Sequence, residues 1–384
     1  MINNKKQKNI PEEWSFKSIG ELLDYEQPTN YIVENTDYNN NHRTPVLTAG
    51  KTFILGYTNE QTGIHDNLPV IIFDDFTTAI KYVDFPFKVK SSAMKILKNK
   101  PQKTNLKFVY GWMQINPFAV GEHKRNYLSE YQYQDVLLPP IDEQNKIVKI
   151  LETWNEYLEQ ISKKIEIKKN VKRGLMQTFF NGEFRLSGFS DKWNIVKLGD
   201  VGEIVTGNTP PMIDKENYKG EYCWATAEDF NGKYINDTKI KLSEKGKDLS
   251  RYLPKGSILV TCIASIGKNA IASVPLATNQ QINAIVVNKK NDNEFIYYFI
   301  QNSNNLLKRY AGAGAMPILN KVTFSKIKIK IPNISEQKVI ANILSKADSE
   351  IMVLEKKKKL VEDQKKHLLN NLITGKIRIP EFSK

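Results

Sequence analysis

Apolar residues recur at alternating steps of four and three in two separate stretches of the chain. The first stretch begins at Ile147 and Leu151, and the second runs from Ile340 to Leu372. An α-helix brings such positions to one face, which is the seam of a coiled coil. The spacing predicts two long helices, at about residues 142–181 and 335–374. The residues expected to pack helix against helix are Ile147, Leu151, Trp154, Leu158, Ile161, Ile340, Leu344, Ile351, Leu354 and Leu368.

Residues that start and stop helices stand at both ends of each stretch. Pro140 and Pro332 precede the two helices, and Gly182 and Gly375 follow their last apolar residues. Ordinary packing of a helix on a domain core would also produce an apolar stripe, and this alternative remains open. Four lysines interrupt the apolar stripe midway along the two helices. These lysines are Lys168, Lys172, Lys358 and Lys365.

The two helical stretches are copies of each other. At a constant offset of 193 residues, fourteen identical pairs fall within residues 137–189 and 330–382, among them Glu143/Glu336, Gln144/Gln337, Leu151/Leu344, Lys172/Lys365 and Arg185/Arg378. A second, shorter repeat lies before each of these stretches. It matches Trp14-x4-Ile19-Gly20-Glu21 with Trp193-x4-Leu198-Gly199-Asp200 at an offset of 179 residues. Each half is therefore a short opening motif, a divergent region and a shared helix.

The duplication limits how the chain can be connected. The first helix leaves the first divergent region and enters the second, and under a pseudo-twofold relation the second helix returns. We therefore expect antiparallel helices, a globular domain at each end, and the segment around Phe382 close to Trp14, which closes a nearly cyclic arrangement. About 40 helical residues give a spacer of roughly 60 Å at the rise of an α-helix.

The divergent regions are expected to be mixed domains dominated by short strands. Val70-Ile71-Ile72-Phe73 and Ile258-Leu259-Val260 are β-prone runs, and Gly207-Asn208-Thr209-Pro210-Pro211 is a loop. The expected fold class is α+β, with two globular, strand-rich α/β domains separated by two long antiparallel coiled-coil helices. The expected division is a first domain at residues 1–138, a central helical region at 139–189, a second domain at 190–330 and a C-terminal helical region at 331–384.

Composition favours a polyanionic partner. The 384 residues include 56 Lys and Arg against 42 Asp and Glu, a net charge of +14, and each phosphate that a basic side chain neutralises releases counterions. A merely soluble basic protein would carry the same charge. Cys223, Cys262 and four scattered histidines give no zinc spacing, so no metal site is expected. The sequence shows neither a leader segment nor an apolar run of about 20 residues, and a cytoplasmic location is expected.

Polar and basic side chains on the expected loops supply candidate DNA contacts. Amides pair with adenine and basic side chains with guanine in the major groove, while Lys and Thr also bind phosphates. For each residue the alternative is a solvated loop side chain. In the first region the candidates are Thr48, Lys51, Thr77, Thr78, Lys81, Lys124 and Arg125. In the second they are Thr206, Asn208, Thr209, Thr261, Ser265, Lys268, Asn279 and Gln280.

In their order and duplication these motifs resemble the specificity subunits of type I restriction–modification systems. The motifs are Pro140-Ile141-Asp142-Glu143-Gln144, Leu198-Gly199-Asp200, Gly207-Asn208-Thr209-Pro210, Pro254-Lys255-Gly256-Ser257-Ile258, Ile266-Gly267-Lys268, Ala277-Thr278-Asn279-Gln280 and Pro332-Asn333-Ile334-Ser335-Glu336-Gln337. The resemblance covers nearly the whole sequence. The first domain departs from it by lacking a Gly-x-Thr-Pro loop and a Thr-Asn-Gln tract.

The resemblance implies that each domain is a target-recognition domain that binds one half of a split DNA site, with the helices setting the gap. It also implies docking of two methyltransferase subunits, which carry S-adenosylmethionine and methylate adenine N6. Motor-nuclease subunits that use ATP and Mg would complete the assembly. The chain itself is expected to bind no cofactor and to contain no catalytic residue.

The residues themselves agree with a non-catalytic role. The sequence has no Asn-Pro-Pro-Tyr or Asp-Pro-Pro-Tyr tetrad and no Walker lysine. Asp74-Asp75 is expected to be structural rather than metal-binding, because adjacent side chains on a strand point to opposite faces. Three alternatives remain open: a specificity chain of a fused restriction–methyltransferase system, a coiled-coil adaptor that binds proteins, and a stand-alone nuclease or methyltransferase. Gel shifts with random DNA would separate the adaptor, since it should show no salt-sensitive DNA binding.

Overall fold

The computed structural model of the chain describes residues 11–48, 52–100, 104–117, 126–181, 184–312 and 317–383. The chain divides into two compact units, unit 1 with residues 1–162 and 357–384 and unit 2 with residues 163–356. Two helices of 40 residues, α4 (Ile141–Phe180) and α10 (Ile334–Ile373), each contribute one part to both units. The unit boundaries therefore fall inside the helices and not at their ends.

Unit 1 consists mainly of short strands. The strands are β1 (Ser15–Ser18), β2 (Leu23–Glu26), β3 (Thr44–Leu47), β4 (Ile54–Thr58), β5 (Val70–Asp74), β6 (Ile80–Val83), β7 (Lys88–Val89), β8 (Met94–Asn99) and β9 (Asp135–Leu138). The short helices are α1 (Ile19–Leu22), α2 (Leu106–Ile115) and α3 (Asn126–Ser129), with 3-10 turns η1 (Pro28–Tyr31), η2 (Tyr131–Tyr133) and η5 (Pro380–Phe382).

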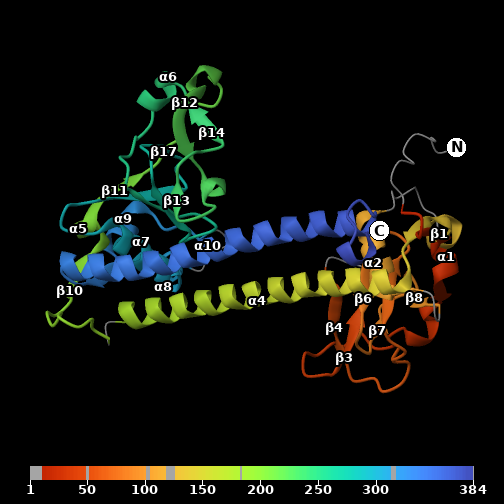
Figure 1. Cartoon of the computed structure of the whole chain (residues 1–384). Helices are drawn as coiled ribbons and strands as arrows, with labels where there is room; N and C mark the ends of the chain where they lie inside the picture. Colours follow the sequence, from red (N-terminus) through yellow and green to blue (C-terminus); the bar gives the residue numbers. More distant parts are fainter. Residues whose placement is uncertain are drawn as a thin grey trace. The chain divides into compact units, whose positions relative to one another are not determined.

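A four-stranded antiparallel sheet in the order β2-β8-β5-β6 forms the centre of unit 1. Its strand β5 is buried along its whole length, as expected for a continuous apolar run covered on both faces. Successive side chains point to opposite faces, so Ile71 and Phe73 belong to one core while Val70 and Ile72 belong to another. Helix α2 packs on the sheet at β5 and β6 (Figure 1).

Unit 2 has the same kinds of element. Its strands are β10 (Asn194–Lys197), β11 (Gly202–Thr206), β12 (Tyr218–Ala225), β13 (Tyr234–Ile235), β14 (Ile240–Leu242), β15 (Ile258–Thr261), β16 (Asn269–Ala272), β17 (Ala277–Thr278), β18 (Ile282–Val287) and β19 (Lys328–Ile331). The helices are α5 (Leu198–Val201), α6 (Glu244–Asp248), α7 (Asn293–Asn302), α8 (Asn304–Tyr310) and α9 (Lys321–Lys326), with 3-10 turns η3 (Lys215–Asn217) and η4 (Ala227–Asp229).

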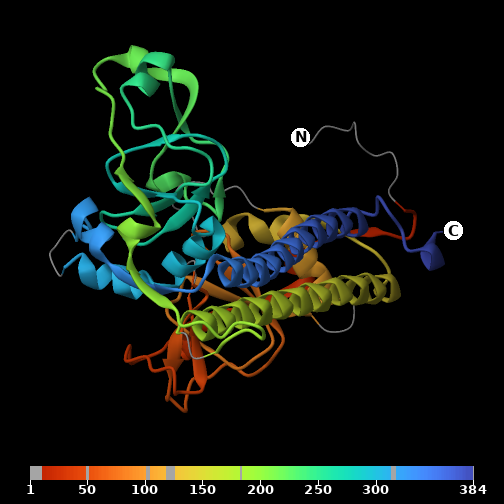
Figure 2. The ribbon, with the colours of Figure 1, turned by 90° about the vertical axis from the view of Figure 1, so that its left-hand side faces the viewer.

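The sheets of unit 2 repeat those of unit 1 strand for strand. The large sheet β11-β18-β15-β16 corresponds to β2-β8-β5-β6 and gains β13 at its edge, and the small sheet β14-β12-β17 corresponds to β4-β3-β7. The pair β10-β19 likewise corresponds to β1-β9. In unit 2 the small sheet and α6 stand apart from α7, α8 and α9, which lie on the other side of the large sheet (Figure 1 and Figure 2). The duplication therefore extends into the regions whose sequences diverge.

Within each unit the segments of α4 and α10 run in opposite directions. In unit 1 the Asn155 side chain contacts Lys365, and the Lys357 ammonium lies 5.4 Å from the Tyr157 ring centroid. In unit 2 the Nζ atom of Lys172 lies 2.6 Å from an Asp348 carboxylate oxygen, and the start of α10 packs with the end of α4 in one core. Three of the four lysines that interrupt the seam are therefore paired across to the other helix, Lys168 with Glu350, Lys172 with Asp348 and Lys365 with Asn155.

The residues expected along the seam are buried to different degrees. Six of them are buried, namely Ile147, Leu151, Ile161, Ile340, Leu344 and Ile351. Four are half-buried, namely Trp154, Leu158, Leu354 and Leu368. The outer seam positions merge with the domain cores, since Ile147 and Leu151 pack with strands of unit 1 and Ile340 and Leu344 with those of unit 2.

A salt bridge between a helix start and the segment that follows the other helix is built twice. In unit 1 the Arg378 guanidinium donates to both oxygens of the buried Glu143 carboxylate, at 2.9 and 2.7 Å. In unit 2 Arg185 holds the buried Glu336 in the same way, at 3.0 and 2.8 Å. In unit 1 Trp14 Nε1 also donates to Glu143, at 2.9 Å.

The glutamine after each of these glutamates fastens a domain helix to the start of the long helix. The Gln144 side chain accepts the backbone N–H of Asn105, the N-cap of α2, at 2.8 Å. The Gln337 side chain accepts the backbone N–H of Asp292, the N-cap of α7, at 2.9 Å. Each glutamine also donates to the carbonyl of the proline before its helix. These contacts give a physical reason for the repeated Glu-Gln pair.

The expected fold class is confirmed, with two strand-rich α/β domains and two long shared helices. The expected closure of the chain is confirmed as well. Ile379 and Phe382 pack with Trp14 in the core of unit 1, and a Cβ added at Gly375 would lie 3.3 Å from Trp14.

Candidate nucleic-acid interface

Three loops of unit 2 meet at one end of its large sheet. The strands that end or begin there do so at Thr206, Thr261, Asn269 and Ile282. The loops after Thr206, after Thr261 and before Ile282 therefore lie together. Together with the strand ends Thr206 and Thr261, they contain all eight candidate contacts of the second domain, which the sequence spreads over residues 206–280.

The loop after β11 is pressed against the tract between β17 and β18. Gly207 N–H donates to Ile282 O at 3.1 Å, and Asn208 N–H donates to Thr278 O at 2.9 Å. A Cβ on Gly207 would lie 2.2 Å from Thr278 Oγ1 and 2.3 Å from two backbone oxygens, which is far inside van der Waals contact. Only glycine fits this crossing without a shift of the loop. The Thr209 hydroxyl donates to the side-chain oxygen of Gln280, which couples the two loops at the surface.

Asn208 and Thr206 hold the loop in place with side chains that already have protein partners. The Asn208 amide donates to Leu249 O at 2.7 Å and accepts the N–H of Arg251 at 2.9 Å. The Thr206 hydroxyl donates to Asn283 at 2.6 Å. Asn279 caps its own turn by accepting the N–H of Gln281 at 3.1 Å. These side chains shape the surface.

The loop after β15 is held in place by hydrogen bonds from buried side chains at its start. Thr261 is buried, and its hydroxyl donates to the carbonyl of Ser265, so it orders the turn and does not reach solvent. The neighbouring Cys262 is also buried and donates to Gln281 O at 3.1 Å; burial raises the pKa of its thiol to about 11. Ser265 and Lys268 are exposed above this base.

The side chains that unit 2 presents at this end are those of Ser265, Lys268, Gln280 and Gln281. Arg251 joins them, since it is exposed and its guanidinium donates to Thr206 O at 2.7 Å. Sequence reasoning missed Arg251, because it lies more than forty residues after the loop to which it bonds. A basic residue flanked by a tyrosine was the only signal.

The same sheet end in unit 1 carries the turn between β5 and β6. The buried Asp74 carboxylate accepts the N–H groups of Phe76 and Thr77 and the Thr77 hydroxyl. Asp74 is thus a turn cap, in line with the structural role expected for it. Its neighbour Asp75 accepts the N–H of Tyr127 at 3.1 Å. Thr78 has a positive φ of 56°, so this turn has a left-handed residue at its tip.

Thr48 and Lys81 lie beside this turn. Thr48 N–H donates to Phe53 O at 2.9 Å, and the Lys81 ammonium lies 5.7 Å from the centroid of the Phe53 ring. Phe53 therefore links the two candidates, with its backbone carbonyl bonded to Thr48 and its ring beside Lys81. Three other candidates, Lys51, Lys124 and Arg125, lie outside the described residues.

Sequence reasoning also missed the turn between β7 and β8. This turn corresponds in the fold to the Asn279–Gln281 tract of unit 2, and it joins the β5–β6 turn through a hydrogen bond from Asp75 N–H to Ala93 O at 3.1 Å. Its exposed residues are Lys90, Ser91 and Ser92. In the sequence this turn is only a lysine followed by two serines between two strands. Its equivalence to the Thr-Asn-Gln tract of unit 2 becomes visible only in the fold.

Among the described residues, no three or more His, Cys, Asp or Glu side chains lie together so that they could hold a metal ion. In the same part of the chain, none of the helices combines the length and the apolarity needed to span a bilayer.

Comparisons with known proteins identify the family. Residues 190–363 match the family profile described as "Type I restriction modification DNA specificity domain". The specificity subunit of the Escherichia coli type I restriction enzyme EcoR124I/EcoR124II is 35% identical over 356 residues, which cover 86% of each chain. This chain belongs to the family of type I restriction enzyme specificity subunits.

Solved structures agree with this at the level of the fold. The S subunit of a type I restriction–modification system from M. genitalium gives a TM-score of 0.61 at 17% identity and covers 97% of both chains. A structure described under complex assembly and conformational transition of the type I R-M system also gives 0.61, at 15% identity, and covers 96% of this chain and all of that one.

Proposed function

We propose that each unit of this chain binds one half of a bipartite DNA target through the loop end of its large sheet. The observation that carries the proposal is the repeated sheet topology, which brings unlike side chains to the same end of both units. The constant parts attach the domains to the helices, while the variable loops differ in chemistry. Two different half-sites can be bound by two copies of one fold only if the loops that contact DNA differ between the copies.

The presented side chains suit contacts with base edges and phosphates. In unit 2 the exposed amides of Gln280 and Gln281 match the donor and acceptor pair of adenine in the major groove. Lys268 supplies a phosphate or guanine contact. Unit 1 offers Lys81 and Lys90 with the hydroxyls of Ser91 and Ser92, a set richer in phosphate-binding groups. The two units therefore contact their half-sites with different chemistry.

The remaining steps belong to other subunits under this proposal. Two methyltransferase subunits, with S-adenosylmethionine as the methyl donor, modify adenine N6 in the bound target. Motor-nuclease subunits use ATP and Mg to translocate and cut unmodified DNA. The chain binds none of these cofactors and acts in the cytoplasm. Its buried, already paired carboxylates, such as Glu143 and Glu336, support a structural use of its acidic groups.

The decisive experiment exchanges one domain. A chain in which residues 13–138 are replaced by the first domain of another specificity subunit is assembled with its partner subunits, and the methylated sites are mapped by whole-genome sequencing. We expect one half-site to change while the other half-site and the gap stay the same. A change in both half-sites, or in neither, contradicts the assignment of one half-site to each unit.

A second experiment tests the helices as a spacer. Seven residues, about two helical turns, are inserted into α4 and into α10 at positions 193 residues apart, so that the seam stays in phase. Mapping of methylated sites should then show a longer gap with both half-sites kept. Unchanged spacing contradicts the spacer role. A chain with the insertion in α4 alone serves as the control and should fail to assemble.

A further inference from the structure

Helices α2 and α7 occupy the same place in the two units. Both have ten residues, and the N-caps Asn105 and Asp292 are held by Gln144 and Gln337 respectively. Counting from these caps, Phe108, Tyr110 and Gln114 of α2 correspond to Phe295, Tyr297 and Gln301 of α7. At the sixth position the helices differ, with Gly111 in α2 and Tyr298 in α7.

In unit 2 the Tyr298 ring fills the space between α7 and the long helices. It is fully buried, and its hydroxyl donates to an Asp348 carboxylate oxygen at 2.5 Å and lies 3.3 Å from Ser345 Oγ. The ammonium groups of Lys172 and Lys233 lie 5.2 and 4.6 Å from the ring centroid, within cation–π range. The site therefore provides both a slot for an aromatic ring and polar partners for its hydroxyl.

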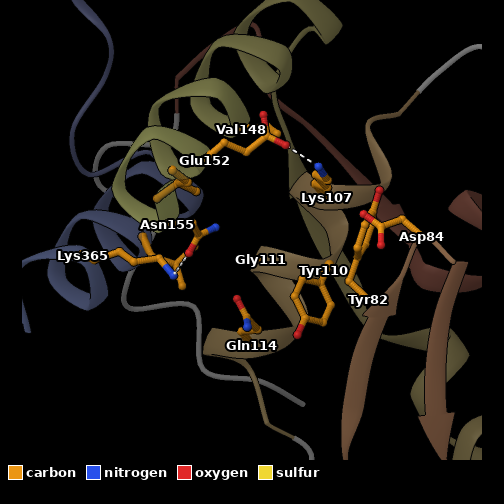
Figure 3. Close-up of a pocket in the computed structure, with 12 residues that line it drawn as sticks. Tyr82, Asp84, Lys107, Tyr110, Gly111, Gln114, Val148, Glu152, Asn155 and Lys365 are labelled. Atoms are coloured by element: carbon orange, nitrogen blue, oxygen red, sulfur yellow. Dashed lines mark hydrogen bonds and ion pairs between the residues drawn. The ribbon is translucent and has the colours of Figure 1, made fainter. Parts of the chain in front are cut away.

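In unit 1 the corresponding space is a cavity of about 360 Å³, which Figure 3 shows ringed by side chains from α2, α4, α10 and β6. Gly111 forms part of its wall without filling it. Asn155 stands at the position of Asp348, Glu152 at that of Ser345 and Lys365 at that of Lys172, each 193 residues away. Unit 1 thus has a polar side chain at each of these three positions, of which only the lysine is the same, and it lacks the ring.

The walls of the cavity match an aromatic guest. The rings of Tyr82 and Tyr110 lie across the cavity from Val148 (Figure 3). Leu151 and Leu369 add further apolar side chains to the wall. The volume lies at the lower end of the range for small-ligand pockets and well above the roughly 150 Å³ that accommodates benzene in an engineered cavity. A single substituted ring fits within it.

The polar groups of the cavity are incompletely matched. The Lys365 ammonium is half-buried and bonds the neutral amide of Asn155, whereas its counterpart Lys172 has the carboxylate of Asp348. Burial accordingly lowers the pKa of Lys365. Lys107 and Glu152 pair with each other on the opposite side. In unit 2 the Tyr298 hydroxyl donates to Asp348 and accepts from the Lys233 ammonium at 2.9 Å, while Lys172 lies over the ring. A guest hydroxyl that donates to Asn155 Oδ1 would repeat the first of these contacts and would accept from Lys365 in place of Lys233.

We propose that the cavity beside Gly111 is a binding site for a phenol-class ligand, one aromatic ring with a hydroxyl directed at Asn155 and Lys365. A free phenolic molecule and a tyrosine side chain of a bound peptide share this chemistry. None of the residues that line the cavity is a candidate DNA contact, so the proposal does not depend on how unit 1 contacts DNA.

The test is a titration of the full chain with p-cresol, the side-chain analogue of tyrosine, followed by calorimetry and ligand-detected NMR. We expect saturable binding at one site. Toluene, which lacks the hydroxyl, should bind about tenfold more weakly, as the loss of one hydrogen bond predicts. A capped Gly-Tyr-Gly peptide distinguishes the two sources: it binds if the site accepts a protein side chain, and it fails to bind if only a free phenol can enter. Absence of saturable p-cresol binding overturns the proposal.

Two reciprocal variants locate the site. Gly111→Tyr places in unit 1 the residue that fills unit 2 and should abolish p-cresol binding. The nearest atoms to a Cβ at Gly111 are the side-chain tips of Leu369 and Ile373, at 3.2 and 3.3 Å, so the variant requires these flexible tips to shift by a few tenths of an ångström. Tyr298→Gly should add a second site, while Tyr298→Phe, which keeps the ring, should leave one.

A third variant keeps the test decisive if either of these fails to fold. Asn155→Leu removes the amide from the partly exposed wall and should weaken p-cresol but not toluene. Undiminished binding of p-cresol to Gly111→Tyr, or equal weakening of both ligands by Asn155→Leu, also contradicts the proposal.

Discussion

Units 1 and 2 share the order of their strands and differ in how the same places are filled. In unit 1 Gly111 leaves a cavity, whereas in unit 2 the Tyr298 ring fills the corresponding space. In unit 1 the indole N–H of Trp14 also donates to Glu143. The indole N–H of Trp193, the counterpart of Trp14, is buried without a protein partner among the described residues. The contacts that fasten each domain to the long helices are nearly identical by comparison. The two copies thus retain the same contacts between domain and long helices, while the residues of their interiors and loops differ.

The largest expected difference between the units concerns the buried glutamates. Glu143→Ala should lower the free energy of unfolding of unit 1 by about 3 kcal/mol, since Arg378 and the Trp14 indole lose the buried carboxylate and Arg378 keeps only the exposed Glu13, at 3.3 Å. Glu336→Ala should cost unit 2 less, because Arg185 is more exposed, at 24% against 15% for Arg378, and no tryptophan bonds to Glu336.

Native-state hydrogen exchange measures these losses, since it reports on each unit separately. Glu143→Gln, which keeps the shape and one acceptor oxygen without the charge, is the matched control and should lose less. Equal losses for Glu143→Ala and Glu336→Ala would show that Trp14 adds nothing to the unit 1 contact.

A second difference concerns the close crossing of loops at Gly207 in unit 2. Gly207→Ala should destabilise unit 2 by about 2 kcal/mol, because its Cβ overlaps backbone oxygens that cannot move independently. The same variant should impair recognition of one half-site while the other is kept. Gly232→Ala in the same unit meets no atom within 4 Å and is the control. Thermal denaturation and site mapping provide the two readouts.

A smaller effect should separate the contact chemistry of the two loop ends. Lys268→Ala in unit 2 and Lys90→Ala in unit 1 should each reduce the slope of log affinity against log salt by about one, if each lysine neutralises one phosphate. Gln280→Ala should instead relax the preference at one base pair by about 1–3 kcal/mol and leave the salt slope unchanged.

Electrophoretic shifts over a series of salt concentrations, with matched and substituted targets, measure both quantities. The exposed Lys359, which pairs with Asp363 one turn along its own helix, provides a control in Lys359→Ala. A salt slope that Lys268→Ala leaves untouched would remove this lysine from the interface.

The smallest effect concerns His65, which has no buried counterpart in unit 2. Its ring lies between Tyr31 and Phe87, and burial, the dominant cause, lowers its pKa despite the nearby Glu26. The unfolded chain therefore binds the proton more readily. Stability of unit 1 should be full above the ordinary histidine pKa of about 6.5 and should fall as the pH decreases below it, by at most about 1.4 kcal/mol per pH unit for one proton.

Denaturation midpoints of unit 1 at pH 7.5 and pH 5.5 test this expectation. His65→Phe keeps an aromatic ring in the stack and should reduce the difference between the two midpoints. An unchanged difference would assign the pH dependence to other groups.

The shared parts of the fold could be predicted from the sequence because they depend on particular residues. Glu143/Glu336, Gln144/Gln337 and Arg185/Arg378 recur at one offset, and each makes the same hydrogen bonds in its unit. The shared sheets could not be predicted in this way. The central strands are formed by Val70-Ile71-Ile72-Phe73 in unit 1 and by Ile258-Leu259-Val260 in unit 2. Burial requires only that these residues be apolar, so equivalent strands need not share identical residues.

The candidate contacts could be predicted as a group but not one by one. The order of the motifs brought eight residues of unit 2 to the same sheet end. Whether a side chain points outward depends on local bonding that the sequence does not reveal. Thr261 ends a strand covered on both faces, and the Asn208 amide is used up by Leu249 and Arg251. Side-chain direction, and not residue type, separated the presenting residues from those that position the loops.

The composition of unit 1 from two distant segments has a consequence for biosynthesis. Its core contains Leu372, Ile373 and Ile379 beside residues from Trp14 onward, whereas unit 2 is one uninterrupted segment. A ribosome delivers the chain from its N-terminus, and domains fold as their residues emerge. The domain translated first is therefore completed last, and its apolar surfaces stay uncovered until the final helix has left the exit tunnel.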